Sequence, residues 1–347
     1  MSFLIGALKI IFLLGFLVFI HEGAHFLVAK KCNVAVREFS IGFGPKIFSK
    51  KKNETNYSIR AIPLGGFVDM YEDDINVNNE NILKENNTNS FLNSSKSKRF
   101  AITIAGIVIN VVFGFLVYFI LQCGVQNVTT TIDRIDESAQ SNLTMLQSGD
   151  TIKEVNGQKI RLKSQIDIAI ASAGKEEAKL KIERNGIIQE VKIPVQKITN
   201  EENNTVSYRL GVYMKKADKT FGNQVYYAFW KTAYFAEMLG KSVSSMFKGN
   251  INPNEMVGPI GISEMIVETD GFYEFFYLLA VVSISLGVTN LLPIPGLDGG
   301  RLLLIIVEAI RRKPLKRETE AQIQLLGFSF LIMLSIYVAF NDVVRIM

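Results

Sequence analysis

The sequence predicts a polytopic α-helical membrane protein with four transmembrane helices, a cytoplasmic loop of β-strands and one extracytoplasmic α/β domain. Hydrophobic residues make up 48% of its 347 residues, and they gather in four apolar runs long enough to cross a bilayer. Lysine and arginine cluster beside these runs, as is typical of the cytoplasmic ends of membrane spans. Membrane topology therefore explains the formal net charge of +5, and no nucleic-acid partner is expected.

The first apolar run, residues 3–20, continues directly into the motif HEGAH at residues 21–25. Residues four apart share one face of a helix, so His21 and His25 can bind one metal ion while Glu22 addresses a water molecule on it. The sequence holds only two histidines, and polar residues are costly inside a membrane. A structural histidine pair is thus the weaker interpretation, and a zinc site within a membrane helix is the prediction.

The segment after this helix is predicted to be cytoplasmic. The first run has no basic N-terminal region and no small-residue cleavage site, so it is interpreted as a retained span and not as a signal peptide. Residues 30–99 contain twelve lysines and arginines, which places them in the cytoplasm and the N-terminus outside. Residues 34–69 have the pattern of strands around a turn at 42–45. They form either a small hairpin or an edge that pairs with a substrate. Residues 72–97 are too polar to fold alone and are interpreted as a linker.

Residues 101–121 form the second predicted span, in which Asn110 is interpreted as a contact between helices rather than a chemical group. Residues 129–195 have an α/β pattern with Asn-Gly hairpin signals at 156–157 and 185–186. By topology this domain lies outside the membrane. The aromatic-rich segment 221–248 is predicted to be a helix at the membrane interface, although core packing under the soluble domain would give a similar pattern.

The third span, residues 275–292, runs into the sequence NLLPIPGLDGG at residues 290–300. Two prolines and three glycines make a continuous helix unfavourable, so Asp298 is expected on unwound chain. A carboxylate would complete a zinc site with two histidines and leave the fourth position for water. Asp298 is preferred over Glu308, for which an ion pair or an interfacial location is the ordinary explanation, and over Asp342, at the far end of the last span.

The fourth span, residues 323–340, follows a basic segment at 311–317. Four spans place both termini outside the membrane. The motif HEGAH and Asp298 then lie near the cytoplasmic ends of their spans, at similar depth.

These motifs make the chain similar to the site-two protease family of intramembrane zinc metalloproteases, in its bacterial branch with one PDZ domain. The resemblance covers almost the whole length. It rests on HEGAH and NLLPIPGLDGG, and on FGPK at 43–46, PLGGFV at 63–68, SGD at 148–150, VNG at 155–157 and VGPIG at 257–261. The chain departs from the family pattern at Ala24, Ile107 and Ser285, where relatives usually or often carry Gly, Pro and Asn.

The resemblance implies one zinc ion bound by His21, His25 and Asp298, with Glu22 as the general base. Asn290 would help to hold the substrate or the developing oxyanion. The cytoplasmic loop would be a membrane-associated β-hairpin that pairs with the substrate as an added strand, and its expected substrate-binding residues are Gly42, Phe43, Gly44, Ile62, Gly65 and Gly66. The expected partners are the lipid bilayer and single-span substrates such as anti-sigma factors or signal-peptide remnants, in a bacterial cell membrane.

The expected division of the chain follows these features. It comprises a first transmembrane helix (1–30), the hairpin loop and polar linker (31–99), a second transmembrane helix (100–122), a PDZ-like domain (123–215), an amphipathic interface region (216–271), a third transmembrane segment (272–310), and a basic loop with the fourth helix (311–347).

Two other functions are compatible with parts of the pattern. The first is a catalytically inactive membrane scaffold that collects partners through its PDZ-like domain. The second is a metal-ion transporter, which predicts further ionisable residues in the other spans. The second span contains none, and proteolysis explains more of the motifs.

Overall fold

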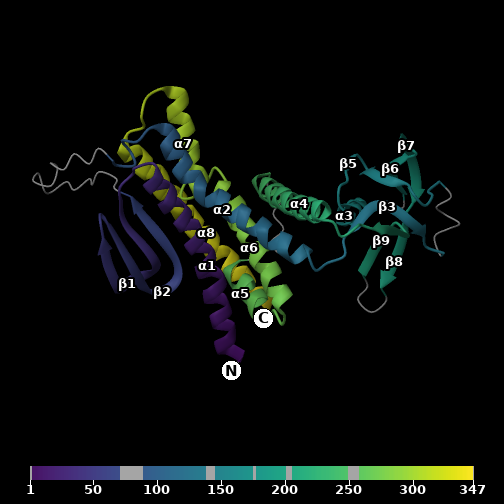
Figure 1. Cartoon of the computed structure of the whole chain (residues 1–347), viewed down its shortest axis with the longest axis horizontal. Coiled ribbons are helices and arrows are strands. Elements are labelled where there is room, and N and C mark those ends of the chain that lie inside the picture. The colour runs from purple at the N-terminus through teal and green to yellow at the C-terminus, as the bar shows by residue number, and fades with distance from the viewer. Residues whose placement is uncertain are drawn as a thin grey trace, which may run out of the picture. The chain divides into compact units, whose positions relative to one another are not determined.

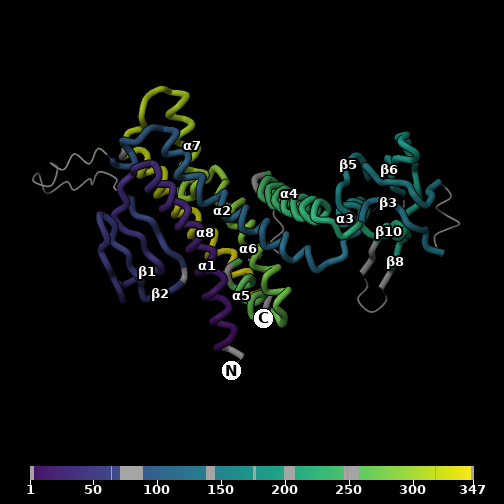
Figure 2. Tube along the Cα trace, in the orientation of Figure 1, coloured from purple at the N-terminus to yellow at the C-terminus, as the bar shows by residue number. Residues whose placement is uncertain are grey.

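The computed structural model describes residues 2–70, 89–137, 145–174, 177–200, 205–248 and 258–346. Most of the predicted linker, residues 71–88, lies outside these ranges. The chain divides into two compact units, one made of Met1–Val117 with Phe235–Met347 and the other of Tyr118–Tyr234. Figure 1 shows the labelled elements, and Figure 2 follows the same path as a Cα trace.

Within the described residues, four helices are long and apolar enough to cross a membrane. These helices are α1 (Ser2–Lys31), α2 (Lys96–Gln122), α6 (Phe272–Leu291) and α8 (Arg317–Ile346). Each one corresponds to one of the four apolar runs of the sequence. In the first unit, the start of α1 and the end of α8 lie at the same end, opposite the connection between α7 (Asp298–Arg311) and α8 (Figure 1).

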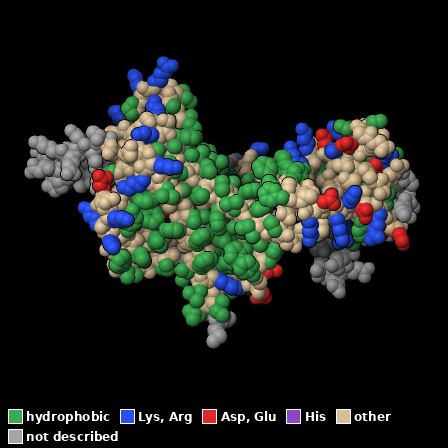
Figure 3. Space-filling model, in the orientation of Figure 1, with side chains coloured by type: hydrophobic (Ala, Val, Ile, Leu, Met, Phe, Trp, Pro, Cys, Tyr) green, Lys and Arg blue, Asp and Glu red, His purple; other side chains and the backbone are tan. Residues whose placement is uncertain are grey.

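The core of the helical unit forms where α1 meets α6 and the short helix α5 (Pro259–Glu268). Leu13 and Leu17 of α1 pack with Ile266, Leu278 and Leu279, and all five side chains are buried. In contrast, most of the α8 surface is exposed in the isolated chain. Figure 3 shows apolar side chains over the helices, and Lys and Arg side chains over the β1–β2 sheet and the α7–α8 end.

Strands β1 (Val36–Lys52) and β2 (Thr55–Met70) form an antiparallel sheet beside α1. Phe39 of β1 lies opposite both Val68 and Tyr57 of β2. Both strands must therefore bend and fold back along the sheet. The register therefore places residues 36–41 between 55–60 and 65–70, and residues 46–52 beyond 55–60. The sheet has one edge at 46–52 and another edge at 65–70.

The bend in β1 falls at residues 42–45, where the sequence predicts a turn. Gly42 and Gly44 have positive φ angles of 87° and 84°, a conformation that glycine adopts without strain. A Cβ atom at Gly42 would also lie 2.5 Å from the carbonyl oxygen of Ile62. The glycines thus permit the two bent strands to approach closely.

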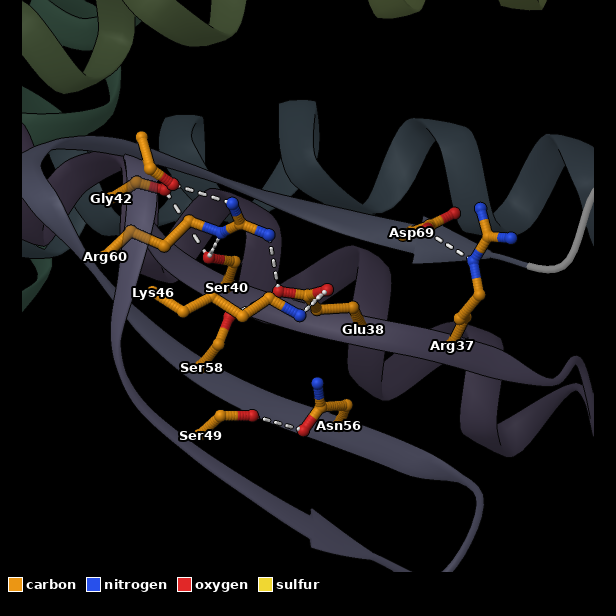
Figure 4. Close-up of polar contacts among 11 residues, drawn as sticks. Arg37, Glu38, Ser40, Gly42, Lys46, Ser49, Asn56, Ser58, Arg60 and Asp69 are labelled. Carbon is orange, nitrogen blue, oxygen red and sulfur yellow. Dashed lines mark hydrogen bonds and ion pairs between the residues drawn. The ribbon is translucent and has the colours of Figure 1, made fainter.

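A polar network on one face of the sheet holds three of its segments together (Figure 4). The carboxylate of Glu38 accepts hydrogen bonds from Ser58 Oγ (2.5 Å), Lys46 Nζ (2.8 Å) and Arg60 Nη2 (2.8 Å). Arg60 Nη1 also donates to the carbonyl oxygen of Gly44 (2.8 Å). Desolvation raises the pKa of Glu38, but the three donors outweigh it and lower the pKa to about 2. Glu38 therefore stays charged and the network stays intact well below neutral pH.

The second unit contains a six-stranded sheet with the order β10-β3-β4-β6-β7, in which β5 pairs with β4. Strands β8 and β9 form a separate pair. The elements are β3 (Val128–Ile135), β4 (Thr151–Val155), β5 (Gln158–Lys159), α3 (Lys163–Ala173), β6 (Glu177–Arg184), β7 (Ile187–Pro194), β8 (Gln196–Asn200), β9 (Thr205–Arg209) and β10 (Val212–Lys216). Helix α4 (Phe221–Phe247) follows, in the segment expected to be an interface helix.

Two hairpins of this unit turn at the Asn-Gly pairs that the sequence singles out. Asn156 and Gly157 connect β4 to β5, and Asn185 and Gly186 connect β6 to β7. All four residues have positive φ angles between 50° and 81°, as a two-residue hairpin turn requires. The core between the sheet and α3 consists of buried aliphatic side chains, including Ile152, Ile166, Ile170, Leu180 and Ile182.

Candidate metal centre

Helix α1 places both histidines of the motif on one face, as the helical repeat requires. The Nε2 atoms of His21 and His25 are 3.3 Å apart, and the two rings are nearly perpendicular, with an interplanar angle of 86°. Both residues are 6% exposed. The imidazoles are therefore buried beside each other with their Nε2 atoms converging on one point.

Asp298 reaches this point from the other end of the chain. Its Oδ2 atom is 3.1 Å from His21 Nε2 and 3.2 Å from His25 Nε2. The sequence predicted Asp298 on unwound chain, but the structure corrects this expectation. Residues 292–297 are non-helical, and Asp298 is the first residue of α7, where a carboxylate interacts favourably with the helix dipole.

Glycines permit the sharp path that leads to Asp298. Added Cβ atoms at Gly299 and Gly300 would collide with the carbonyl oxygens of Leu292 and Ile294. A Cβ atom at Gly327 of α8 would collide with the backbone of Pro295. The non-helical segment is thus enclosed by its own helix and by α8, as membrane-embedded irregular backbone requires.

The three groups fit a tetrahedral zinc ion. Ligands at about 2.0–2.1 Å from a tetrahedral metal are separated from each other by about 3.3–3.4 Å. The observed separations among His21 Nε2, His25 Nε2 and Asp298 Oδ2 are 3.1, 3.2 and 3.3 Å. Asp298 Oδ2 is also buried without a hydrogen-bond partner among the described residues. Among the described residues, His21, His25 and Asp298 are the group of histidine, cysteine and acidic side chains that lie close enough together to hold a metal ion.

Helix α2 contacts the Nδ1 atoms of the two imidazoles, whereas Asp298 faces their Nε2 atoms. His25 Nδ1 is 2.7 Å from the carbonyl oxygen of Ile102, and His21 Nδ1 is 3.0 Å from the side-chain amide of Asn110. Between these two contacts, a Cβ atom at Gly106 would overlap both imidazole rings. The sequence predicted only a helix contact for Asn110 and no role for Gly106. A four-residue spacing of Gly106 and Asn110 in an apolar span was the available signal.

A cavity of about 660 Å³ opens beside the three converging groups. It is lined by α1, β2, α7 and α8, and among its lining residues are Glu22, His25, Gly66, Val68, Asp298 and Phe328. The backbone N–H of Val68 donates a hydrogen bond to the Glu22 carboxylate. Glu22 therefore stands between the ligand atoms and the 65–70 edge of the sheet.

The structure separates the six expected substrate-binding residues. Gly66 lines the cavity beside Glu22. The other five lie at the bends of the strands, where the ring of Phe43 covers Gly65 and Gly42 approaches Ile62. Gly44 lies at the same bend, near the side chain of Ile62.

Asn290 lies at the metal centre. Its Nδ2 atom is 3.5 Å from His21 Nε2. It occupies the last turn of α6, just before the non-helical segment that leads to Asp298. The structure thus brings Asn290 to the same ligand atom that faces Asp298.

The two rival carboxylates have other partners. Glu308 pairs with Arg99 Nη2 and accepts a hydrogen bond from the backbone N–H of Leu315 (2.8 Å). This contact is the ion pair that the sequence favoured for it. Asp342 accepts hydrogen bonds from the backbone N–H groups of Gly258 (3.1 Å) and Gly261 (3.0 Å). Asp342 thereby caps the first turn of α5.

Comparison with known proteins assigns the family. A model of peptidase family M50 matches residues 9–334. The chain belongs to peptidase family M50. A "Regulator of sigma-W protease RasP" from Bacillus subtilis is 29% identical and is matched over 97% of each chain. A "Zinc metalloprotease RasP" from Bacillus licheniformis is 28% identical over 97% of this chain and 98% of that one. A protein of Clostridium acetobutylicum is 31% identical over 95% of both chains.

The family and the four candidate spans show that this member of M50 is a membrane zinc metalloprotease. A comparison with solved structures found a PDZ domain of an SdrC-like protein from Listeria monocytogenes, which covers 26% of this chain and 85% of its own length. The sequence identity is 15% and the TM-score is 0.18. This value is too low to support a common fold.

Proposed function

We propose that this M50 protein is an intramembrane protease that hydrolyses peptide bonds in or near the membrane span of single-span proteins. One zinc ion would be held by His21, His25 and Asp298, and Glu22 would act as the general base. The observation that carries the proposal is the triangle of ligand atoms beside a cavity that Glu22 also lines.

Glu22 has the position that proton transfer requires. When bound, zinc acidifies a water molecule and polarises a substrate carbonyl group. The Glu22 carboxylate would take a proton from the attacking water and give one to the leaving amine nitrogen as the peptide C–N bond breaks. The N–H of Val68 holds the Glu22 carboxylate in place, and the buried wall of α2 limits the access of bulk water. Asn290, 3.5 Å from His21, is suited to donate to the substrate carbonyl oxygen as it gains negative charge.

We further propose that the 65–70 edge of the β1–β2 sheet holds the substrate in an extended form. A peptide bond inside a helix has its carbonyl group hydrogen-bonded and its backbone covered by side chains. Pairing with a strand edge keeps a segment extended and exposes its backbone. The contact between Glu22 and Val68 supports this edge over the opposite one, because it lies directly at the cavity.

The proposed setting is a bacterial cell membrane. Residues 31–99 and 311–316 would lie in the cytoplasm and both termini outside, in agreement with the basic side chains over the sheet and the α7–α8 end. Residues 123–215 would form an extracytoplasmic PDZ-like domain, followed by the interface helix α4. The expected substrates are single-span proteins such as anti-sigma factors or signal-peptide remnants, and the name of the Bacillus subtilis relative refers to sigma-W.

Zinc content and cleavage by the purified wild-type chain and by Glu22→Gln test this proposal. Each protein is assayed in detergent with a fluorogenic single-span substrate. We expect about one zinc per chain in both proteins and cleavage by the wild type alone, because Gln keeps the shape of Glu but cannot accept the proton. A wild type without zinc would refute the metal site, whereas cleavage by Glu22→Gln would refute the role of Glu22.

A further inference from the structure

Asn110 is the one side chain of α2 that hydrogen-bonds a proposed zinc ligand, among the described residues. We propose that Asn110 is a positioning residue: its side-chain oxygen accepts the Nδ1 proton of His21 and thereby presents Nε2 of His21 to zinc. This inference rests on the proposed function, since it takes His21 as a ligand. It gives Asn110, in the middle of the apolar second span, a role in metal binding.

The direction in which His21 points fixes the tautomer that it needs. Its Nε2 atom faces Asp298 Oδ2 at 3.1 Å and His25 Nε2 at 3.3 Å. A neutral imidazole that offers Nε2 to a metal carries its proton on Nδ1. That proton requires an acceptor, because a buried N–H group without a hydrogen-bond partner is unfavourable. Asn110, with its amide 3.0 Å from Nδ1, lies in the acceptor's position.

The chemistry of the contact sets the orientation of the Asn110 amide. An NH₂ group facing Nδ1–H would bring two donors together, whereas the side-chain oxygen would form a hydrogen bond. The two ends of an amide have nearly the same shape, so the hydrogen-bond network decides between them. As placed, Asn110 Nδ2 is the amide atom 3.0 Å from His21 Nδ1, and Asn110 Oδ1 is buried with no hydrogen-bond partner among the described residues. A half-turn of the amide about its last side-chain bond exchanges these two atoms. The oxygen is therefore available to accept the proton of His21.

Packing keeps Asn110 at this position and keeps water out. Asn110 is completely buried, and its backbone carbonyl oxygen accepts a hydrogen bond from Ser283 Oγ of α6 (2.8 Å). One turn along α2 on either side, glycines let neighbouring groups approach. Gly106 faces the imidazoles, and Gly114 faces Ile284 of α6. In the folded chain the Asn110 side chain is therefore shielded from solvent and held beside His21.

The other histidine supplies an internal contrast. His25 Nδ1 is 2.7 Å from the backbone carbonyl oxygen of Ile102, which no side-chain substitution removes. Helix α2 thus orients both proposed ligands, His25 through its backbone and His21 through Asn110. Loss of the Asn110 acceptor should weaken one ligand and leave the second in place, so zinc affinity should fall without being abolished.

Zinc affinity of full-length variants tests the inference. Metal-depleted protein in detergent is titrated with zinc against a chromophoric chelator, and cobalt-substituted protein gives an absorption spectrum that reports the ligand geometry. Asn110→Leu removes the acceptor with similar volume, Asn110→Ala removes it without steric burden, and Asn110→Asp retains an acceptor. The control is Ser285→Ala, since Ser285 Oγ donates to the carbonyl oxygen of Val281 within its own helix (2.8 Å). Thermal unfolding of each variant checks that it is folded.

We expect Asn110→Leu and Asn110→Ala to bind zinc about 10–100-fold more weakly, while Asn110→Asp and Ser285→Ala stay close to wild type. The cobalt spectrum should change in the first two variants only. If both acceptor-free variants bind zinc like the wild type, or if Asn110→Asp loses as much affinity as they do, the inference is overturned. If Asn110→Leu does not fold, Asn110→Ala decides. A wild type without zinc would instead overturn the proposed function, on which the inference rests.

Discussion

At the scale of the residue, the centre depends on side chains that are absent as much as on those that are present. Gly106 lies on α2 where the imidazoles of His21 and His25 pass closest to it. Any side chain there would enter the space of the rings. In contrast, a Cβ atom at Gly23, inside the HEGAH motif, would have no atom within 4 Å. The close approach of the two imidazoles thus requires a residue without a side chain at position 106.

Gly106→Ala should therefore impair zinc binding, although alanine is the better helix former by about 0.8–1.0 kcal/mol. Displacement of two ligands should lower zinc affinity by a factor on the order of 10–100, with cleavage falling in parallel. Metal analysis after dialysis against a weak chelator measures the effect. The matched control is Gly23→Ala, which should keep its zinc. Equal zinc contents in the two variants would contradict the steric argument.

At the scale of the element, the bent sheet brings one of its edges to Glu22, the proposed general base. Residues 65–70 pair with residues 36–41 on one side, and the Val68 N–H on the other side reaches Glu22. The network around Glu38 ties the remaining segments together. A rigid sheet supports an edge that is ready to accept an added strand.

Val68→Pro should lower cleavage with little change in zinc content, because proline removes the backbone N–H at this edge and alters no proposed ligand. One hydrogen bond of about 1–1.5 kcal/mol corresponds to a fall of about tenfold in kcat/KM. Val68→Ala, which keeps the N–H, should cleave like the wild type. Lys51→Pro interrupts the opposite edge of the same sheet and should also have little effect. Unimpaired cleavage by Val68→Pro would argue against a role for the Val68 N–H in holding Glu22 at the 65–70 edge.

At the scale of the whole molecule, the four candidate spans and the distribution of charge predict a single orientation. The start of α1 and the end of α8 lie at one end of the helical unit, and the basic α7–α8 connection lies at the other (Figure 1). The two native cysteines are free, and Cys123 is exposed. Cys123 follows the end of α2 that the proposed topology places outside the cell.

A membrane-impermeant maleimide should label Cys123 on intact cells, and Cys123→Ser should abolish that labelling. In a cysteine-free variant carrying Ser49→Cys, on the exposed edge of the sheet, labelling should require permeabilised cells, because the sheet is proposed to be cytoplasmic. Gel shifts of the labelled protein give the measurement. Labelling of Ser49→Cys on intact cells would invert the proposed topology.

Local sequence patterns by themselves predicted most of the secondary structure of this protein and part of its candidate site. The four apolar runs became four helices, the Asn-Gly pairs became hairpin turns, and the HEGAH spacing put His21 and His25 on one face. The prolines and glycines after Asn290 interrupted the third span as expected. These features follow from the period of a helix and from local backbone energetics, which residues near in sequence decide by themselves.

Only the tertiary structure decided how distant groups meet. It brought Asp298 to 3.1 and 3.2 Å from the two imidazoles at the start of α7, and it gave Glu308 and Asp342 to other partners. The packing of α2 against α1 also placed the Asn110 side chain beside His21 and left no space for a side chain at Gly106. Such contacts depend on how helices pack against each other. A periodic pattern states which face of a helix is apolar, but not which atom of another helix lies opposite each residue on it.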